Sequence, residues 1–264
     1  MINYLMTTEA YSGIMLVSRI NQRMENAILS MMIRQPEELR LYVDTLKVSE
    51  EGVFEKGREL SEVALFKGTL RVFPQTVTDN CPDHHDDVTR NVIRAICEAE
   101  NEAVLQCDDD DVALIDVSKY LPLMDSKIGI MYGDVVARQG GKTFIRDSKP
   151  IHGALEAGNA KGSVCLYNRD AMRNIAGKVD VNRTDITERP PWYGYFYDRQ
   201  IIYWLLRMGY RTVHINDLWS IQNVNTSHSG KRKKLYGRWE EIVAYNDELD
   251  NGNYVESYLS MGED

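Results

Sequence analysis

The chain has 264 residues, of which 43% are hydrophobic and 27% are charged. This composition is typical of an ordinary soluble globular protein, and the length allows one large α/β domain or two smaller ones around a sizeable core. The net charge is −9, from 31 basic and 40 acidic residues, so no overall positive field favours nucleic acid or an anionic membrane.

Cysteine usage and the apolar segments indicate an intracellular protein. None of the four cysteines stands at a spacing typical of a paired or metal-binding motif, so we expect reduced thiols. The N-terminus lacks a basic stretch followed by an apolar core, and no apolar run is long enough to span a bilayer. The sequence therefore predicts a cytoplasmic protein (host cytoplasm if viral) with no membrane span.

Strands and helices are predicted to alternate along the first half of the chain. Pro36 ends the first helical pattern, Ser49 is a typical N-terminal cap of the second, and Asp86 or Asp87 caps the third. Such alternation predicts parallel strands joined by right-handed crossovers. The expected strands cover residues 13–20, 39–43, 70–73 and 103–107, and the expected helices cover residues 24–32, a stretch from 49, and a stretch that ends at 100.

The second half is predicted to be organised differently. Gly140 and Gly141 lie between two strand-like stretches of residues 127–145, a pattern typical of a β-hairpin. Residues 180–191 are polar and end in two prolines, so we expect a loop there. Further strands are expected at 163–167 and 212–215, and helices at 169–175 and 197–208, the second of them ended by Gly209.

Four consecutive aspartates, Asp108 to Asp111, end the apolar run of residues 103–107 abruptly. Ligands in open α/β sheets bind beyond the carboxyl ends of such buried strands. Carboxylates this close together repel one another unless a cation or solvent screens them, and hard divalent cations prefer oxygen ligands. An acidic run taken alone is more often a solvated loop, but its position at a strand end favours a metal site.

Four segments, in chain order, resemble glycosyltransferases of the GT-A fold, closest to the inverting enzymes of family 2. The first segment is the opening strand followed by Asn21, Arg23 and a helix that ends in the pattern Ser-x-x-x-x-Gln at residues 30–35. The second is Thr-Arg-Asn at residues 89–91, followed by a strand and the four aspartates. This second segment resembles the helix and DxD motif of the family.

The other two segments lie in the second half. Residues 162–170 (GSVCLYNRD) resemble the strand and helix that face the acceptor. Residues 196–200 (FYDRQ), followed by Leu-x-x-x-Gly-Tyr at 205–210, resemble the helix that carries the catalytic carboxylate. The family usually has Glu-Asp there, whereas this chain has Tyr197 in place of the Glu and retains Asp198.

The resemblance implies an α/β fold of GT-A type, with a Rossmann-like mixed central sheet flanked by helices and a DxD motif after a central strand. It covers roughly residues 13–228. We therefore expect a glycosyltransferase domain at residues 1–230, with a donor-binding half (1–118) and an acceptor and catalytic half (119–230). A partly helical tail, first basic and then acidic, is expected at residues 231–264.

The resemblance also implies a metal-dependent transfer from a nucleotide-diphosphate sugar, with UDP as the expected nucleotide. Asp110 would ligate the cation, Asp108 would reach the metal shell or the donor ribose, and His228 is either a further ligand or a loop histidine without a role. An oxygen-rich site with one imidazole suits Mn²⁺ or Mg²⁺ better than zinc. Such a cation neutralises the leaving diphosphate as a Lewis acid.

Asp198 is the candidate general base for the acceptor hydroxyl, and it is alternatively only the cap of the helix that follows. For the donor, we expect contacts from residues at the ends of the first strands and on two helices. Asp44 could accept hydrogen bonds from a base edge, and Arg90 could pair with phosphate. Ser18, Arg19 and Arg23 could meet the nucleotide, although both of these arginines could equally belong to a solvated face.

The acceptor is predicted less sharply. Trp192, Tyr193 and Tyr195 could form a platform for an acceptor ring, or they could fill the core as aromatic residues more often do. The basic run at residues 231–234 could contact an anion or be solvated surface. We expect a saccharide of a cell-surface polymer; the alternative is hydroxymethylcytosine in phage DNA, since compact family members without membrane helices include phage enzymes. The oligomeric state stays open.

Two other classes of protein remain as alternatives. A nucleotidyltransferase uses a similar sheet and an Asp-bound Mg²⁺, but it usually opens with a glycine-rich loop, and residues 17–21 contain no glycine. A non-catalytic acidic module would bind Ca²⁺ or a partner, but the four aspartates lack the glycine and glutamate spacing of an EF-hand loop.

Overall fold

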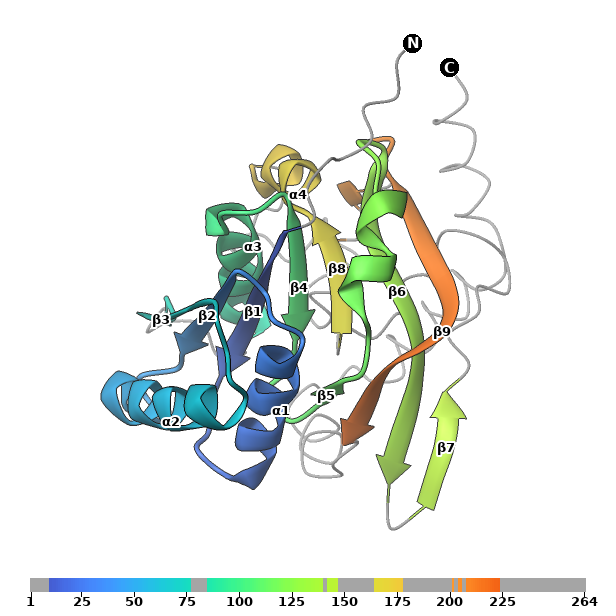
Figure 1. Cartoon of the computed structure of the whole chain (residues 1–264). Coiled ribbons are helices and arrows are strands. Elements are labelled where there is room, and N and C mark those ends of the chain that lie inside the picture. Colours follow the sequence, from blue (N-terminus) through green and yellow to red (C-terminus); the bar gives the residue numbers. More distant parts are fainter. Residues whose placement is uncertain are drawn as a thin grey trace, which may run out of the picture.

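The computed structural model describes residues 10–76, 85–139, 142–146, 164–177, 201, 204–205 and 208–223. Within these residues the chain forms one mixed nine-stranded sheet with helices on both faces (Figure 1). The strands follow the order β3-β2-β1-β4-β8-β6-β9-β5, and β7 pairs with β6. This architecture confirms the α/β class with a mixed central sheet that the sequence predicts.

The first half of the chain forms the parallel part of the sheet. Strands β1, β2, β3 and β4 all run in the same direction. Asn21 and Ser49 cap the first two helices, because their side-chain oxygens accept hydrogen bonds from backbone N–H groups of the first turn. The elements are β1 (Tyr11–Val17), α1 (Gln22–Ile33), β2 (Glu38–Val43), α2 (Glu50–Val63), β3 (Thr69–Pro74), α3 (His85–Glu98) and β4 (Ala103–Cys107).

The second half adds antiparallel and crossing strands. β8 runs antiparallel to both β4 and β6, and β6 and β7 form the predicted hairpin. β9 pairs with β6 in parallel, with register shifts near Gly133, where an added Cβ would clash with the Trp219 ring. The elements are β5 (Val112–Ala113), η1 (Val117–Lys119), η2 (Leu121–Leu123), β6 (Ile128–Gln139), β7 (Lys142–Arg146), β8 (Val164–Asn168), α4 (Arg169–Ala176) and β9 (Arg211–Asn223).

Two apolar clusters cover the two faces of the sheet. One packs α1 and α2 against side chains such as Met15 and Leu41, and the other packs α3 and α4 against side chains such as Ile14 and Val104. Consecutive residues of β2 and β4 are therefore buried on both faces, which explains their continuous rather than alternating apolar pattern.

Several predicted boundaries differ from the structure. The first strand ends at Val17 rather than at residue 20, so Ser18 and Arg19 lie just beyond it. Helix α3 begins at His85, which places Asp86 and Asp87 inside its first turn rather than before it. The strand expected at 212–215 is the start of the much longer β9, and the two-residue β5 was not predicted.

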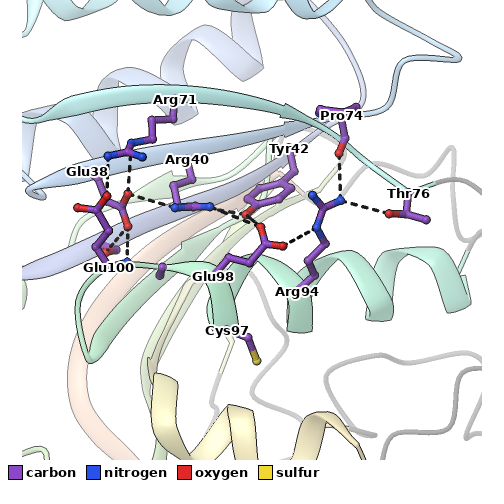
Figure 2. A network of polar contacts seen from close by, with 12 residues as sticks. Glu38, Arg40, Tyr42, Arg71, Pro74, Thr76, Arg94, Cys97, Glu98 and Glu100 are labelled. Atoms are coloured by element: carbon purple, nitrogen blue, oxygen red, sulfur yellow. Dashed lines mark hydrogen bonds and ion pairs between the residues drawn. The ribbon is translucent and has the colours of Figure 1, made fainter.

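A buried polar network joins the start of β2 to the end of α3 (Figure 2). Glu38 is 1% exposed, and its carboxylate lies 3.3 Å from the guanidinium of Arg40. Glu38 also accepts hydrogen bonds from the Ser12 hydroxyl at 2.8 Å and from the Glu100 backbone N–H at 2.7 Å. Because each oxygen of this carboxylate has a donor, its burial is compensated.

The network continues across β2 and β3 to α3. The Tyr42 hydroxyl donates to Glu98 at 2.9 Å, and Arg94 pairs with the same Glu98 at 2.8 Å. Arg40 also lies over the ring of Phe73, 4.5 Å from its centre, as in cation–π contacts. Burial raises the pKa of Tyr42 to about 12, so its hydroxyl stays protonated and able to donate. These contacts fasten β2 and β3 to α3.

Of the cysteines in the described residues, Cys107 and Cys165 are buried and Cys97 is half-buried, and all three are free thiols, as predicted. Cys81 lies outside these residues. None of the described helices is both long and apolar enough to cross a membrane.

Candidate functional site

Three predicted site residues follow neighbouring parallel strands at the same edge of the sheet. Val17 of β1 stands opposite Val43 of β2, and Ile14 of β1 stands opposite Gln106 of β4. Ser18, Asp44 and Asp108 come directly after these strands. The structure therefore brings the predicted nucleotide-binding positions and the acidic loop, Asp108–Asp111, to the carboxyl edge where open α/β sheets bind their ligands.

Asp109 fastens the acidic loop to the end of β1. Its side chain is 8% exposed, and one of its oxygens accepts hydrogen bonds from the Ser18 backbone N–H at 2.8 Å and from the Ser18 hydroxyl at 2.9 Å. Asp109 was not among the predicted site residues. No local pattern in the sequence indicates this role, because it depends on β1 and β4 lying side by side in the sheet.

Arg19 brings a guanidinium to the same loop. Its Nε and its second terminal nitrogen lie 3.3 Å from the two oxygens of Asp109, and its first terminal nitrogen lies 3.4 Å from Asp110. The arginine side chain is 28% exposed and Asp110 is 20% exposed, so this ion pair is accessible to solvent. Arg19 was predicted to meet the donor, and the structure shows it in contact with the acidic loop and, at 3.4 Å, with the Ser18 hydroxyl.

Asp108 occupies an electrostatically unfavourable position in the acidic loop. Burial and then the neighbouring carboxylates of Asp111, Asp110 and Asp109 raise its pKa well above the usual range of an aspartate. The Gln106 side-chain amide donates to Asp108 at 3.3 Å, which favours the charged form but offsets the other effects only in part. A cation bound nearby would relieve this repulsion, so the site chemistry fits a hard divalent ion.

The residues after the acidic loop are held in place by contacts with α1 and with β9. The Ala113 backbone N–H donates to the Ser30 hydroxyl of α1 at 3.0 Å. β5 pairs antiparallel with β9, with Ala113 opposite Ser220. The Asp111 backbone N–H also reaches the Asp108 carbonyl at 3.3 Å. Together with the contact to Ser18, these bonds fix the backbone that presents the carboxylates, which is how binding sites on rigid scaffolds are preorganised.

Asp44 lies at the predicted place and has partners in its own turn. It is buried, one oxygen accepts from the Leu46 backbone N–H at 3.2 Å, and the other lies 2.6 Å from the ammonium group of Lys47. Its backbone N–H donates to the Val17 carbonyl at 2.8 Å, which joins the ends of β1 and β2. The side chain therefore shapes the turn after β2, and its contact with a nucleotide base stays a prediction.

Arg23 and Arg90 occupy helices of the donor-binding half. Arg23 lies in the first turn of α1, where its backbone N–H donates to the capping Asn21 side chain at 3.0 Å. Arg90 is half-buried in α3. Their predicted contacts with the nucleotide and with phosphate remain predictions.

The remaining candidates fall outside the described residues. These are the predicted general base Asp198, the predicted ligand His228, and the aromatic acceptor residues Trp192, Tyr193 and Tyr195. Among the residues that the structure does describe, no group of three or more His, Cys, Asp and Glu side chains is placed to hold a metal ion. Asp108 and Asp110 therefore account for only part of the expected ligand set.

Solved structures of other proteins have a similar fold. The chain resembles the crystal structure of S. aureus TarS 1-349 over 81% of its length, with a TM-score of 0.55 and 13% identity. It also resembles the mannosyltransferase PcManGT from Pyrobaculum calidifontis, solved with GDP-Man and Mn²⁺, over 87% of its length, with a TM-score of 0.52 and 14% identity. These likenesses show that the chain has the GT-A glycosyltransferase fold.

The likeness does not extend over the whole of those proteins. The chain covers 60% of the TarS structure and 59% of PcManGT. No protein-family model matches the sequence, and no curated protein matches it. These likenesses therefore establish the fold alone.

Proposed function

We propose that this protein is a metal-dependent glycosyltransferase, which moves a sugar from a nucleotide-diphosphate donor to an acceptor hydroxyl. The observation that carries the proposal is the acidic loop at the carboxyl edge of a GT-A sheet, anchored to β1 through Asp109 and Ser18. PcManGT, which shares the fold, was solved with a nucleotide sugar and Mn²⁺. Mn²⁺ fits a site rich in carboxylates, and a cation bound there would offset the repulsion between these carboxylates and an anionic donor.

In this proposal Asp108 and Asp110 would hold Mn²⁺ or Mg²⁺, with His228 as a further ligand. The bound cation would supply Lewis-acid neutralisation of the diphosphate leaving group. The raised pKa of Asp108 supports this assignment, because a carboxylate that is buried and is also repelled by its neighbours gains most from a nearby cation. Asp109 would keep the loop in place through its bonds to Ser18.

Donor recognition would use the turns that follow β1 and β2. Asp44 would meet the nucleotide base, and Ser18, Arg19 and Arg23 would line the nucleotide site. Arg90 would pair with phosphate, because a guanidinium can donate two parallel hydrogen bonds to phosphate oxygens. We propose UDP as the nucleotide and leave the sugar open.

Asp198 would act as the general base. It would take the proton of the acceptor hydroxyl as the new glycosidic bond forms, and the anomeric carbon would invert when the hydroxyl attacks opposite the leaving diphosphate. The acceptor is proposed to be a saccharide bound against Trp192, Tyr193 and Tyr195. Transfer by an Asp198→Asn variant at the normal rate would remove this assignment, whereas unchanged donor binding without transfer would support it.

A donor panel tests the activity directly. The protein is incubated with several UDP- and GDP-sugars, with and without Mn²⁺, and released sugar is measured for the normal chain and for Asp110→Asn. Slow, Mn²⁺-dependent hydrolysis of one donor that the variant lacks would support the proposal. Pyrophosphate release from a nucleoside triphosphate and a sugar phosphate would indicate a nucleotidyltransferase. Inertness toward every donor would contradict the proposal.

A further inference from the structure

Arg19 contacts two carboxylates of the acidic loop, one of which the proposed cation would use. Its guanidinium reaches both oxygens of Asp109 at 3.3 Å and one oxygen of Asp110 at 3.4 Å. Asp110 is the proposed metal ligand, so the arginine and the metal ion compete for the same carboxylate. Two cations cannot approach one carboxylate closely without repelling each other.

The two contacts of Arg19 differ in how the rest of the structure supports them. Asp109 is also held by two shorter bonds from Ser18, at 2.8 and 2.9 Å, so it stays in place whatever Arg19 does. Asp110 receives a single, longer contact from the arginine and is more exposed than Asp109. The contact to Asp110 is therefore the one that can be exchanged without undoing the loop.

We propose that Arg19 is a built-in counter-ion of the acidic loop, and that the divalent cation must displace it from Asp110. The residue thereby sets the affinity for the cation and keeps it lower than four neighbouring aspartates alone would give. This inference rests on the proposed function and deepens it. A guanidinium released from Asp110 keeps its Asp109 contacts and regains free N–H groups, which suit phosphate oxygens.

The amino end of the sheet, opposite the acidic loop, offers a residue for a matched control variant. Arg211 begins β9 and forms an ion pair with Asp125 at 2.6 Å, with 57% of the arginine side chain exposed. It stands opposite Ile128, at the start of β6. The end of β8 pairs both with the start of β6 and with the start of β4, so Arg211 lies at the end of the sheet opposite the acidic loop. Replacing Arg211 changes the net charge by the same amount as replacing Arg19, far from the acidic loop.

The test measures Mn²⁺ binding without donor, by titration calorimetry, in the full chain and in the Arg19→Gln and Arg211→Gln variants. We expect Arg19→Gln to bind Mn²⁺ about tenfold more tightly, because removal of a unit positive charge a few ångströms away favours the cation by this order. Its melting temperature should fall without metal and rise more on Mn²⁺ addition than that of the normal chain. Arg211→Gln should bind Mn²⁺ as the normal chain does.

Unchanged or weaker Mn²⁺ binding by Arg19→Gln would overturn the inference, because a purely structural arginine would give that result. If Arg19→Gln does not fold, Arg19→Met serves instead, since it also removes the charge and keeps an unbranched side chain, and the same gain of about tenfold is expected. Mn²⁺ binding that depends on Asp110 but not on residue 19 would remove only this inference. Equal binding by the normal chain and Asp110→Asn would also remove the proposed metal site.

Discussion

The two ends of the central sheet differ in how far their acidic side chains are balanced by basic ones. At the amino end, three carboxylates (Glu38, Glu98 and Glu100) contact three guanidinium groups (Arg40, Arg71 and Arg94) in one network. At the carboxyl end, four consecutive aspartates include two that share the guanidinium of Arg19. The balanced end fits a structural role. At the acidic end, the carboxylates repel one another, and a bound cation can relieve this repulsion. Functional sites are where such locally unfavourable arrangements are expected.

The largest effect on stability is expected when a positive charge is removed from the network at the amino end. Arg40→Met leaves the buried Glu38 without its principal cation, and we expect the free energy of unfolding to fall by about 3–5 kcal/mol. Urea denaturation measures this loss of stability. The control is Arg58→Met, at an exposed position of α2, for which we expect a change within about 0.5 kcal/mol. A loss below 1 kcal/mol for Arg40→Met would mean that this network does not stabilise the fold.

At the acidic end, the main effect should fall on activity rather than on stability. Asp110→Asn removes a proposed metal ligand, and we expect sugar transfer to slow at least about a hundredfold, or roughly 2.7 kcal/mol in the barrier. Initial rates with Mn²⁺ and the active donor measure it. The control is Asp116→Asn, an exposed aspartate near Lys119, which should keep the full rate. Equal rates in the two variants would remove Asp110 from the mechanism.

A smaller effect is expected where the acidic loop meets β1. Ser18→Ala removes the hydroxyl that donates to the buried Asp109 at 2.9 Å, and we expect a loss of about 1–2 kcal/mol in stability, as for hydrogen bonds to charged groups. Ser61→Ala is the control, since that exposed hydroxyl donates only to a neutral backbone carbonyl. Chemical denaturation should separate the two variants; a Ser18 variant as stable as the Ser61 variant would mean that Asp109 is not an anchor.

The smallest effect has the opposite sign. Asp108→Asn removes a carboxylate whose pKa is raised, and we expect the protein without metal to gain about 1 kcal/mol at neutral pH, the Coulomb energy of two nearby charges in water. A raised pKa means that the native state of the normal chain loses stability as the pH rises from about 4, the usual aspartate value, through the raised value. The variant keeps that stability.

Denaturation at pH 4 and at pH 7.5 checks this sign. The two proteins should be nearly equally stable at pH 4, where the carboxyl is protonated in the native state and about half protonated in the unfolded state, and should differ at pH 7.5. A variant that is less stable than the normal chain at pH 7.5 would show that the Asp108 carboxylate is stabilised rather than strained at this site.

Much of the fold could be predicted from the sequence because local signals agreed with it. Three kinds of local pattern were informative. Apolar runs on strands that are buried on both faces predicted β2 and β4 close to their observed bounds. The Ser49 cap predicted the start of α2, and the Gly140–Gly141 pattern predicted the β6–β7 hairpin. The two-residue β5 could not be predicted, because its pairing with β9 is a long-range contact without a local pattern. The same holds for the length of β9.

The position of the candidate site on the sheet could be predicted, but the contacts between its side chains could not. Strand order puts Ser18, Asp44 and Asp108 at one edge, and a sequence that alternates strands and helices implies that edge. The roles of Asp109 and Arg19 depend on side chains from β1 and β4 meeting across the sheet. Such contacts are set by packing and are separated by about ninety residues in the sequence, so no local pattern indicates them.

Coupling between metal and nucleotide tests the central claim most directly. The melting temperature is measured with Mn²⁺ alone, with UDP or GDP alone, and with both, for the normal chain and Asp110→Asn. If a cation at the acidic loop holds the diphosphate, the combined shift of the normal chain exceeds the sum of the separate shifts, and the variant shows simple additivity. Additive shifts in both proteins would contradict the account.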